Sequence, residues 1–231
     1  MGMNNSRNFD LLTLGQVLLR LSPPDNERLS RGDTFVKQVG GAELNVAVGA
    51  ALLGLHTGVI SKLPAHDIGS FMKGKIRSFG VSDDFFMYDQ SSAARVGIYY
   101  YENGAYPRKP KVIYDRNHSS FFSLDIDEIP EEVYTASKCF HTTGITLALN
   151  GDIRETTIEM IKRFKAAGTL VSFDVNFRGN LWTGDQAREC ILRILPYVDI
   201  FFCSEDTARL TFLKTGTARE MMKSFTEEFP I

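Results

Sequence analysis

The sequence predicts an α/β protein in which a parallel sheet is flanked by helices. Short apolar runs typical of strands alternate with longer helical runs, and this alternation is the pattern of βαβ units. A glycine pair, Gly40-Gly41, opens directly into a helical run, so the backbone can turn sharply there and a ligand can approach it closely. The chain has 231 residues, 43% of them hydrophobic, which suits a globular protein with a sizeable core.

Composition argues against several classes of partner. The net charge of -2 implies no general attraction to nucleic acid or to membranes, and no apolar run is long enough to span a bilayer. The polar N-terminus, residues 1–8, lacks a signal-peptide core, and we expect it to be disordered. The three cysteines lie far apart without a C-x-x-C pair, which favours a reducing, cytoplasmic location and no metal site.

The first elements follow from apolar runs and their breakers. Residues 9–21 read as one strand interrupted by Gly15, before a proline pair ends it. Apolar and small residues cover most of the circumference of the helix that follows the glycine pair, so we expect it to be fully buried and to end at Gly54. A strand over 57–63 and a helix to about residue 79 continue the alternation.

Two tyrosine-rich runs then interrupt that rhythm. Residues 94–102 and 111–115 read as β-strands joined by a Gly/Pro loop, and we expect them to form a small lid beside the main sheet. The alternation resumes with a helix over 127–136, a strand over 138–144, a helix over 154–167, strands over 170–177 and 198–203, and a helix over 217–228. Ligands of open α/β sheets bind at the carboxyl ends of the strands, where Arg178 follows residues 170–177.

Several segments together resemble one family. Residues 40–47, Gly-Gly-Ala-Glu-Leu-Asn-Val-Ala, look like the first signature of the PfkB (ribokinase-like) sugar kinases. Residues 15–23, 95–99, 112–116 and 174–178 are similar to segments of the 2-keto-3-deoxygluconate kinases within that family. The resemblance implies a ribokinase-like three-layer fold, a parallel sheet flanked by helices with a small β lid, in one domain over 9–231. The inserted lid segments would be about 22–38 and 94–117.

The same resemblance implies a substrate site and a reaction. It places the guanidinium groups of Arg116 and Arg178 at one site, and two converging guanidiniums suit a carboxylate better than a neutral sugar. The implied reaction is transfer of the ATP γ-phosphate, with Mg²⁺, to a primary hydroxyl of a sugar acid such as 2-keto-3-deoxygluconate. Lids of this family often pair between subunits, so we expect a homodimer. The implied substrate-binding residues are Gly40, Gly41, Asn45, Tyr99, Tyr114, Arg116 and Arg178, and Glu205 would lie near magnesium and phosphate.

The chain also departs from the family pattern. Arg20 stands where ribokinases carry an Asp that grips sugar hydroxyls, and Gln16 replaces a more usual Glu for a reason that the sequence does not show. The family's Asn-x-x-Glu is replaced around Glu205 by Ser204 and Thr207. The second signature, Asp-Thr-x-Gly-Ala-Gly-Asp, is absent, because the resemblance covers about the first two-thirds of such a kinase.

We therefore assign no catalytic residue, because the expected catalytic Asp would lie beyond Ile231. We expect these 231 residues alone to be inactive and to leave an unpaired sheet edge. Three alternatives stay open. A fructokinase- or ribokinase-type enzyme is disfavoured by Arg20 and Arg116, and a Rossmann dehydrogenase by the missing third glycine of G-x-G-x-x-G. A non-catalytic sugar-acid-binding remnant is suggested by the missing segment.

Overall fold

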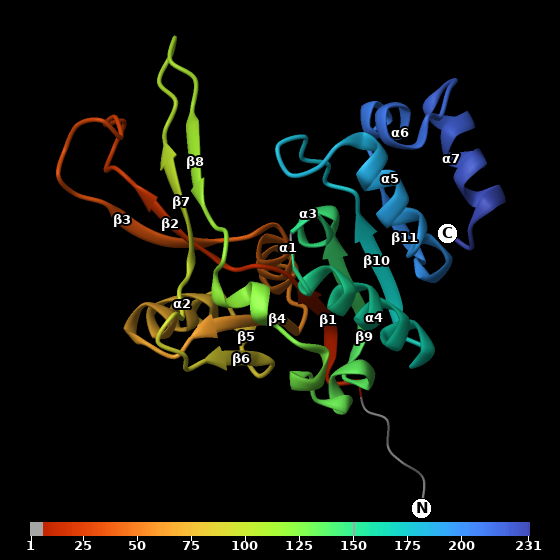
Figure 1. Cartoon of the computed structure of the whole chain (residues 1–231), viewed down its shortest axis with the longest axis horizontal. Coiled ribbons are helices and arrows are strands. Elements are labelled where there is room, and N and C mark those ends of the chain that lie inside the picture. Colours follow the sequence, from red (N-terminus) through yellow and green to blue (C-terminus); the bar gives the residue numbers. More distant parts are fainter. Residues whose placement is uncertain (1–6, 150) are drawn as a thin grey trace, which may run out of the picture.

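The computed structural model describes residues 7–149 and 151–231, and it contains one large parallel sheet and one smaller sheet (Figure 1). The strands of the large sheet run in the order β11-β10-β9-β1-β4-β5, with β6 also paired to β4, and all these pairings are parallel. These strands are β1 (Phe9–Leu14), β4 (Thr57–Pro64), β5 (Val81–Ser82), β6 (Phe86–Asp89), β9 (Ser137–Thr143), β10 (Leu170–Asp174) and β11 (Ile200–Phe202).

Helices cover both faces of the large sheet and make the fold three-layered. Val59 and Ile60, neighbours on β4, belong to different core clusters, since successive side chains of a strand point to opposite faces. One cluster joins the sheet to α1 (Ala42–Leu52) and α2 (Asp67–Ser78). The other joins it to α3 (Gly144–Ala148), α4 (Ile153–Ala166), α5 (Gly184–Leu192), α6 (Glu205–Phe212) and α7 (Ala218–Glu228).

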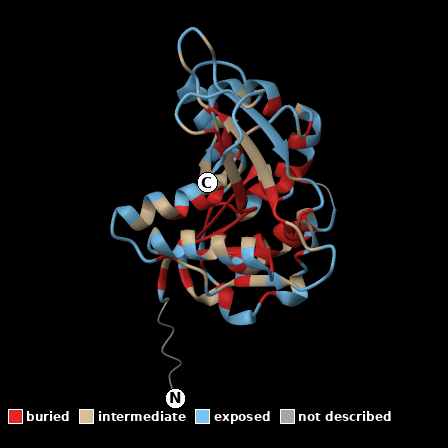
Figure 2. Cartoon of the chain, turned by 90° about the vertical axis from the view of Figure 1, so that its left-hand side faces the viewer, coloured by how far each residue is buried: buried red, intermediate tan, exposed pale blue. Residues whose placement is uncertain are grey.

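The smaller sheet stands beside the large one, as the sequence predicts for the lid. Its strands are β2 (Leu18–Ser22), β3 (Val36–Gly40), β7 (Gly97–Glu102) and β8 (Lys111–Asp115), in the order β3-β2-β7-β8. The β2–β7 pairing is parallel, and the two outer pairings are antiparallel. Buried residues gather in the large sheet, whereas much of the small sheet is half-buried or exposed (Figure 2).

Two predicted elements are wrong. Residues 9–21 are not one strand, because the chain leaves the large sheet after Leu14 and enters the small one at Leu18. The break falls at Gly15, where a Cβ atom would overlap the carboxylate of Glu43. Residues 127–136 are not an α-helix either, because Pro130 separates two short 3₁₀ turns, and a proline interrupts backbone hydrogen bonding. The 3₁₀ turns of the chain are Ser120–Ser123, Ile126–Glu128, Glu131–Thr135 and Leu195–Tyr197.

The helix after the glycine pair forms as predicted, but it is not fully buried. α1 packs one face on β1 and β4, and the side chains of Glu43, Leu44 and Ala47 are its buried ones. Leu52 is 76% exposed. The prediction failed because a uniformly apolar helix does not show which of its faces has a neighbour.

The sequence predicts that residues 1–8 are disordered. Residues 1–6 of this segment lie outside the residues that the structure describes. Arg7 is described, and its guanidinium donates a 2.7 Å hydrogen bond to the carbonyl oxygen of Gly168. Within the described residues, no helix has the length and apolar character needed to cross a membrane.

Candidate functional site

A cavity of about 410 Å³ opens at the carboxyl edge of the large sheet. β1, β9 and β10 all end at this edge, and the residues that follow them, Gln16, Ile145 and Arg178, line the cavity. Parallel strands bring their carboxyl ends together, which is why ligands of α/β sheets bind there. The sequence placed Arg178 at this edge, and the structure confirms that position.

The small sheet supplies the opposite wall of the cavity. Arg20 on β2 pairs in register with Tyr99 on β7, which pairs in turn with Tyr114 on β8. The two tyrosine rings lie 5.9 Å apart between centroids. Tyr101 and Val112 face the cavity from the same side, because alternate residues of a strand share a face.

The structure brings most of the predicted substrate-binding residues together. Six line the cavity, namely Gly41, Asn45, Tyr99, Tyr114, Arg116 and Arg178, and Gly40 lies beside Tyr99. Asn45 and Arg178 are exposed and therefore accessible to a ligand. Their contacts with a substrate stay predictions.

The glycine pair allows a close approach that side chains would block. A Cβ atom on Gly40 would overlap the hydroxyl of Tyr99. Gly41 has a φ of 151°, and a Cβ atom there would lie 2.8 Å from the carbonyl oxygen of Gln16. The pair therefore lets α1 begin directly against the β1–β2 connection and against the tyrosine wall, which is formed by Tyr99, Tyr101 and Tyr114.

Three guanidinium groups line the cavity and give it a positive character. The Arg20 guanidinium lies 4.2 Å from the ring centroid of Tyr101, and its Nε donates to the hydroxyl of Ser22 at 2.9 Å. Burial lowers the pKa of Arg116 and nearby Glu43 raises it, but a guanidinium stays charged at any physiological pH. In the part of the chain that the structure describes, Arg20, Arg116 and Arg178 form no ion pair.

Sequence reasoning treated Arg20 as a departure from ribokinases, not as a site residue. Its alternation with Leu18 along one strand was the available signal, since both side chains line the cavity.

Sequence reasoning also missed a buried carboxyl group beside the cavity. Glu43 is 2% exposed, and its Oε1 accepts hydrogen bonds from the hydroxyls of Thr143 at 2.6 Å and Thr146 at 2.8 Å. Burial raises the pKa of this carboxyl group, against the opposing effect of those hydrogen bonds. Glu43 thus ties the start of α1 to the start of α3 and fixes two walls of the cavity. No local sequence pattern identifies a partnership across 100 residues.

A tight turn delivers Arg178 to the cavity. The predicted strand over 170–177 ends early, at Asp174, whose Oδ1 accepts a 2.9 Å hydrogen bond from the backbone N–H of Asn176. Asn176 has a φ of 37°, in the left-handed region that asparagine tolerates. Arg178 and Arg116 also line an adjoining cavity of about 240 Å³, so both cations lie where the two cavities meet.

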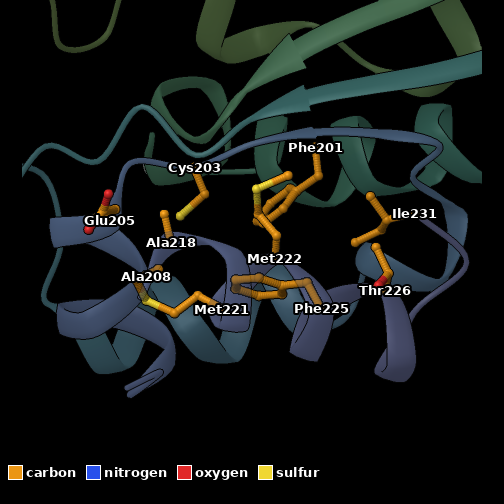
Figure 3. Close-up of a pocket in the computed structure, with 10 residues that line it drawn as sticks. All are labelled: Phe201, Cys203, Glu205, Ala208, Ala218, Met221, Met222, Phe225, Thr226 and Ile231. Atoms are coloured by element: carbon orange, nitrogen blue, oxygen red, sulfur yellow. The ribbon is translucent and has the colours of Figure 1, made fainter. Parts of the chain in front are cut away.

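The structure does not bring Glu205 to this cavity. Glu205 begins α6, is exposed, and its carboxylate lies 3.5 Å from the guanidinium of Arg209. It sits at the edge of a separate, mainly apolar cavity of about 190 Å³ formed by β11, α6 and α7 (Figure 3). No cluster of three His, Cys, Asp or Glu side chains within residues 7–149 and 151–231 could hold a metal ion. The predicted role of Glu205 near magnesium and phosphate stays a prediction.

Comparison with known families shows which family this chain belongs to. Residues 8–228 match the family model described as pfkB family carbohydrate kinase. The chain belongs to this family. The family resemblance read from the sequence is thereby confirmed, and the ribokinase-like fold agrees with the solved structures of the family.

Similar proteins include several sugar-acid kinases. The 2-dehydro-3-deoxygalactonokinase of Haloferax volcanii is 34% identical over 220 residues, covering 95% of this chain and 68% of that protein. The 5-dehydro-2-deoxygluconokinase of Clostridium botulinum is 30% identical over 177 residues, covering 76% of this chain and 51% of that protein. The crystal structure of 2-dehydro-3-deoxygluconokinase from Thermotoga maritima matches with a TM-score of 0.86 and 32% identity, over 95% of this chain and 68% of that one. The chain thus spans about half to two-thirds of the length of these relatives.

Proposed function

We propose that this chain supplies the acceptor site of a kinase that phosphorylates a primary hydroxyl of a sugar acid similar to 2-keto-3-deoxygluconate. The observation that carries the proposal is the pair Arg116 and Arg178. Both line the cavity, and both are without an ion-pair partner among the described residues. Guanidinium groups bind carboxylates through paired N–H donors, so the site suits an anionic acceptor better than a neutral sugar.

Similarity supports the same substrate class. The relatives from Haloferax volcanii, Clostridium botulinum and Thermotoga maritima are all named as kinases of sugar acids. Family membership implies ATP as the phosphate donor, with a divalent cation such as Mg²⁺. The residues described here act on the acceptor: the arginines hold its carboxylate, the tyrosine wall packs against its carbon chain, and Asn45 hydrogen-bonds its hydroxyls.

Two alternatives lead to different results. A fructokinase- or ribokinase-type enzyme would bind a neutral sugar, which the three guanidiniums disfavour. A non-catalytic sugar-acid-binding protein would share the binding behaviour but transfer no phosphate, and an ADP-release assay on a version that carries the second family signature separates it from a kinase. The dehydrogenase alternative is wrong, because the chain belongs to a kinase family.

The test is the affinity of the protein for acid and neutral ligands, measured by calorimetry. We expect 2-keto-3-deoxygluconate to bind much more tightly than fructose. Arg178→Ala should weaken acid binding roughly 10- to 100-fold, the range expected when a charge-assisted hydrogen bond is lost. Arg188→Ala, which removes an exposed arginine on α5 away from the cavity, is the matched control and should change nothing. Equal binding of acid and fructose, or full affinity in Arg178→Ala, would exclude the proposal.

We also propose that the protein is a cytoplasmic homodimer that pairs through the small sheet. The exposed edge strand β8 supports pairing. Three free cysteines support a reducing compartment, and burial raises the pKa of Cys139 to about 11 and that of Cys203 to about 12, which disfavours the reactive thiolate form of both.

A further inference from the structure

One carboxylate of the protein lies where it would compete with the acceptor for the two arginines. The adjoining cavity of about 240 Å³ is lined by Arg116 and Arg178, and Asp115 lines it as well. Among the described residues that line this cavity, Asp115 is the only one with a carboxylate. A carboxylate in this place binds a free guanidinium by the same paired hydrogen bonds as a substrate carboxylate does.

The two arginines are open to such competition. Arg116 Nε donates to the neutral amide oxygen of Gln16 at 2.7 Å, and in the described part of the chain neither arginine forms an ion pair. Glu43, the carboxyl group that lines the main cavity, accepts hydrogen bonds from two threonine hydroxyls instead. Both guanidiniums therefore stay available to an acceptor only while Asp115 is held elsewhere.

Arg95 holds Asp115 in another position. It lies two residues before β7, and β8, the antiparallel partner of β7, ends at Asp115. Arg95 Nη2 donates to Asp115 Oδ1 at 2.8 Å, and Nη1 donates to the main-chain oxygen of Asn117 at 3.0 Å. One guanidinium thus binds the chain on both sides of Arg116.

The backbone of Arg95 is fixed independently of its side chain. Its N–H donates to the hydroxyl of Ser120 at 3.2 Å, and its carbonyl oxygen accepts from the N–H of Ser120 at 2.9 Å. The Ser120 hydroxyl donates in turn to Asp89 Oδ2 at 2.7 Å. Truncation of the Arg95 side chain should therefore leave this part of the backbone in place.

The ion pair between Arg95 and Asp115 is too exposed to serve mainly as a stabilising contact. The two side chains are 38% and 53% exposed, and ion pairs exposed to this degree contribute little to stability. Burial does not immobilise the Asp115 side chain either, so without Arg95 it is free to turn toward the cavity.

We infer that Arg95 is a positioning residue, which holds the carboxylate of Asp115 away from Arg116 and Arg178 and so keeps both guanidiniums free for the carboxylate of the acceptor. This inference rests on the proposed function.

The test is a double-mutant cycle of Arg95→Ala and Asp115→Asn on the full chain, with calorimetric affinity for 2-keto-3-deoxygluconate as the readout. Arg95→Ala should weaken acid binding roughly 3- to 10-fold, because the released carboxylate occupies the arginines in most molecules. Asp115→Asn alone should change the affinity by no more than about twofold, since Arg95 already holds that carboxylate. The double variant should return to within about twofold of the wild-type affinity.

The cycle separates this role from two others. If Arg95 acted only by holding the main-chain oxygen of Asn117, the double variant would bind as weakly as Arg95→Ala. If only the net charge near the cavity mattered, the two changes would be additive, and Asp115→Asn alone would strengthen binding as much as Arg95→Ala weakens it. Either result would overturn the inference, and so would wild-type affinity in Arg95→Ala.

Two further variants complete the experiment. Arg95→Gln removes the charge but keeps a side-chain donor, and it replaces Arg95→Ala in the cycle if that variant fails to fold. Arg193→Ala is the matched control and should bind normally, because Arg193 pairs with an exposed carboxylate, that of Glu155 at 2.6 Å, and neither residue lines the two cavities. Normal affinity in Arg178→Ala would instead overturn the proposed acid-binding function.

Discussion

Single residues shape this site through contacts with groups that are far away in the sequence. Gly40 makes room for the hydroxyl of Tyr99, and Gly15 makes room for the carboxylate of Glu43, although each glycine is far in sequence from the group it accommodates. A larger side chain at either glycine would displace a cavity wall. The cavity is thus shaped as much by missing Cβ atoms as by the side chains that line it.

Glu43 should make stability depend on pH in an unusual direction. Burial raises the folded-state pKa of its carboxyl group above the unfolded value, so its contribution to stability is fully present below the unfolded pKa and is lost as pH rises through the folded one. Glu43→Gln cannot titrate. Its free energy of unfolding relative to wild type should therefore rise above about pH 4, by up to about 1.4 kcal/mol per pH unit, and level off above the folded pKa.

Urea unfolding at several pH values measures this difference. Glu220→Gln is a suitable control, because hydrogen bonds from Thr217 lower the pKa of that exposed carboxyl group and the pH trend should be opposite in sign. A difference between wild type and Glu43→Gln that stays constant from pH 4 to pH 8 would mean that Glu43 is not strained by its burial.

The predictability of the site follows from where each contact lies in the sequence. Gly41, Asn45 and Arg116 stand inside recognisable local segments, so family resemblance found them. Gln16 and Glu43 lie in such segments too, but their contacts could not be found in this way, because their partners lie 100 residues further along the chain. Only the meeting of the two sheets brings these groups together.

At the scale of elements, tertiary packing determines which sheet a strand joins and which face of a helix is buried, and the sequence pattern does not show either. The periodicity of residues 9–21 is that of a strand throughout, and nothing local shows that β1 and β2 join different sheets. The apolar α1 likewise gives no sign of which face packs on β1 and β4. Alternation of strands and helices was predictable because it depends on local periodicity alone.

Two glycines of α2 should respond oppositely to substitution by alanine. Gly74 is exposed inside the helix with nothing within 4 Å of an added Cβ, so Gly74→Ala should stabilise the protein by about 0.5–1 kcal/mol. A Cβ atom on Gly69 would overlap the carbonyl oxygen of Pro64, so Gly69→Ala must push α2 away from the end of β4. We expect a loss of about 1–3 kcal/mol there.

The urea midpoints of the two variants, at an unchanged slope, give both values. The pair controls for helix propensity, since both glycines lie in the same helix and gain the same methyl group. Equal shifts of the two midpoints would show that α2 does not pack on β4 as closely as the structure has it.

At the scale of the whole molecule, the site exists because two sheets meet at one edge. The large sheet supplies the ends of β1, β9 and β10, and the small sheet supplies the tyrosine wall and two of the three guanidinium positions, Arg20 and Arg116. The inner face of the small sheet is therefore committed to the cavity, and Leu19 on its outer face packs into the core cluster with α1 and α2, while its β8 edge remains exposed.

The exposed edge of the small sheet at β8 should pair two copies of the protein. All five residues of β8 are exposed, and Ile113 points away from the cavity that its neighbours Val112 and Tyr114 line. Phe35, 47% exposed, packs on Tyr100 with ring centroids 6.0 Å apart and extends the apolar outer face. Exposed strand edges with apolar side chains are readily covered by another strand. A charge at Ile113 should therefore abolish pairing, because it would be buried without a partner.

Sedimentation velocity at micromolar concentration tests this directly. Wild type should sediment as a dimer and Ile113→Arg as a folded monomer. Leu210→Arg places the same charge on an exposed leucine of α6, away from the small sheet, and should leave the dimer intact. A wild-type protein that sediments as a monomer would rule out pairing through the small sheet. Dissociation by Leu210→Arg but not by Ile113→Arg would place the interface at the α6 side of the molecule instead.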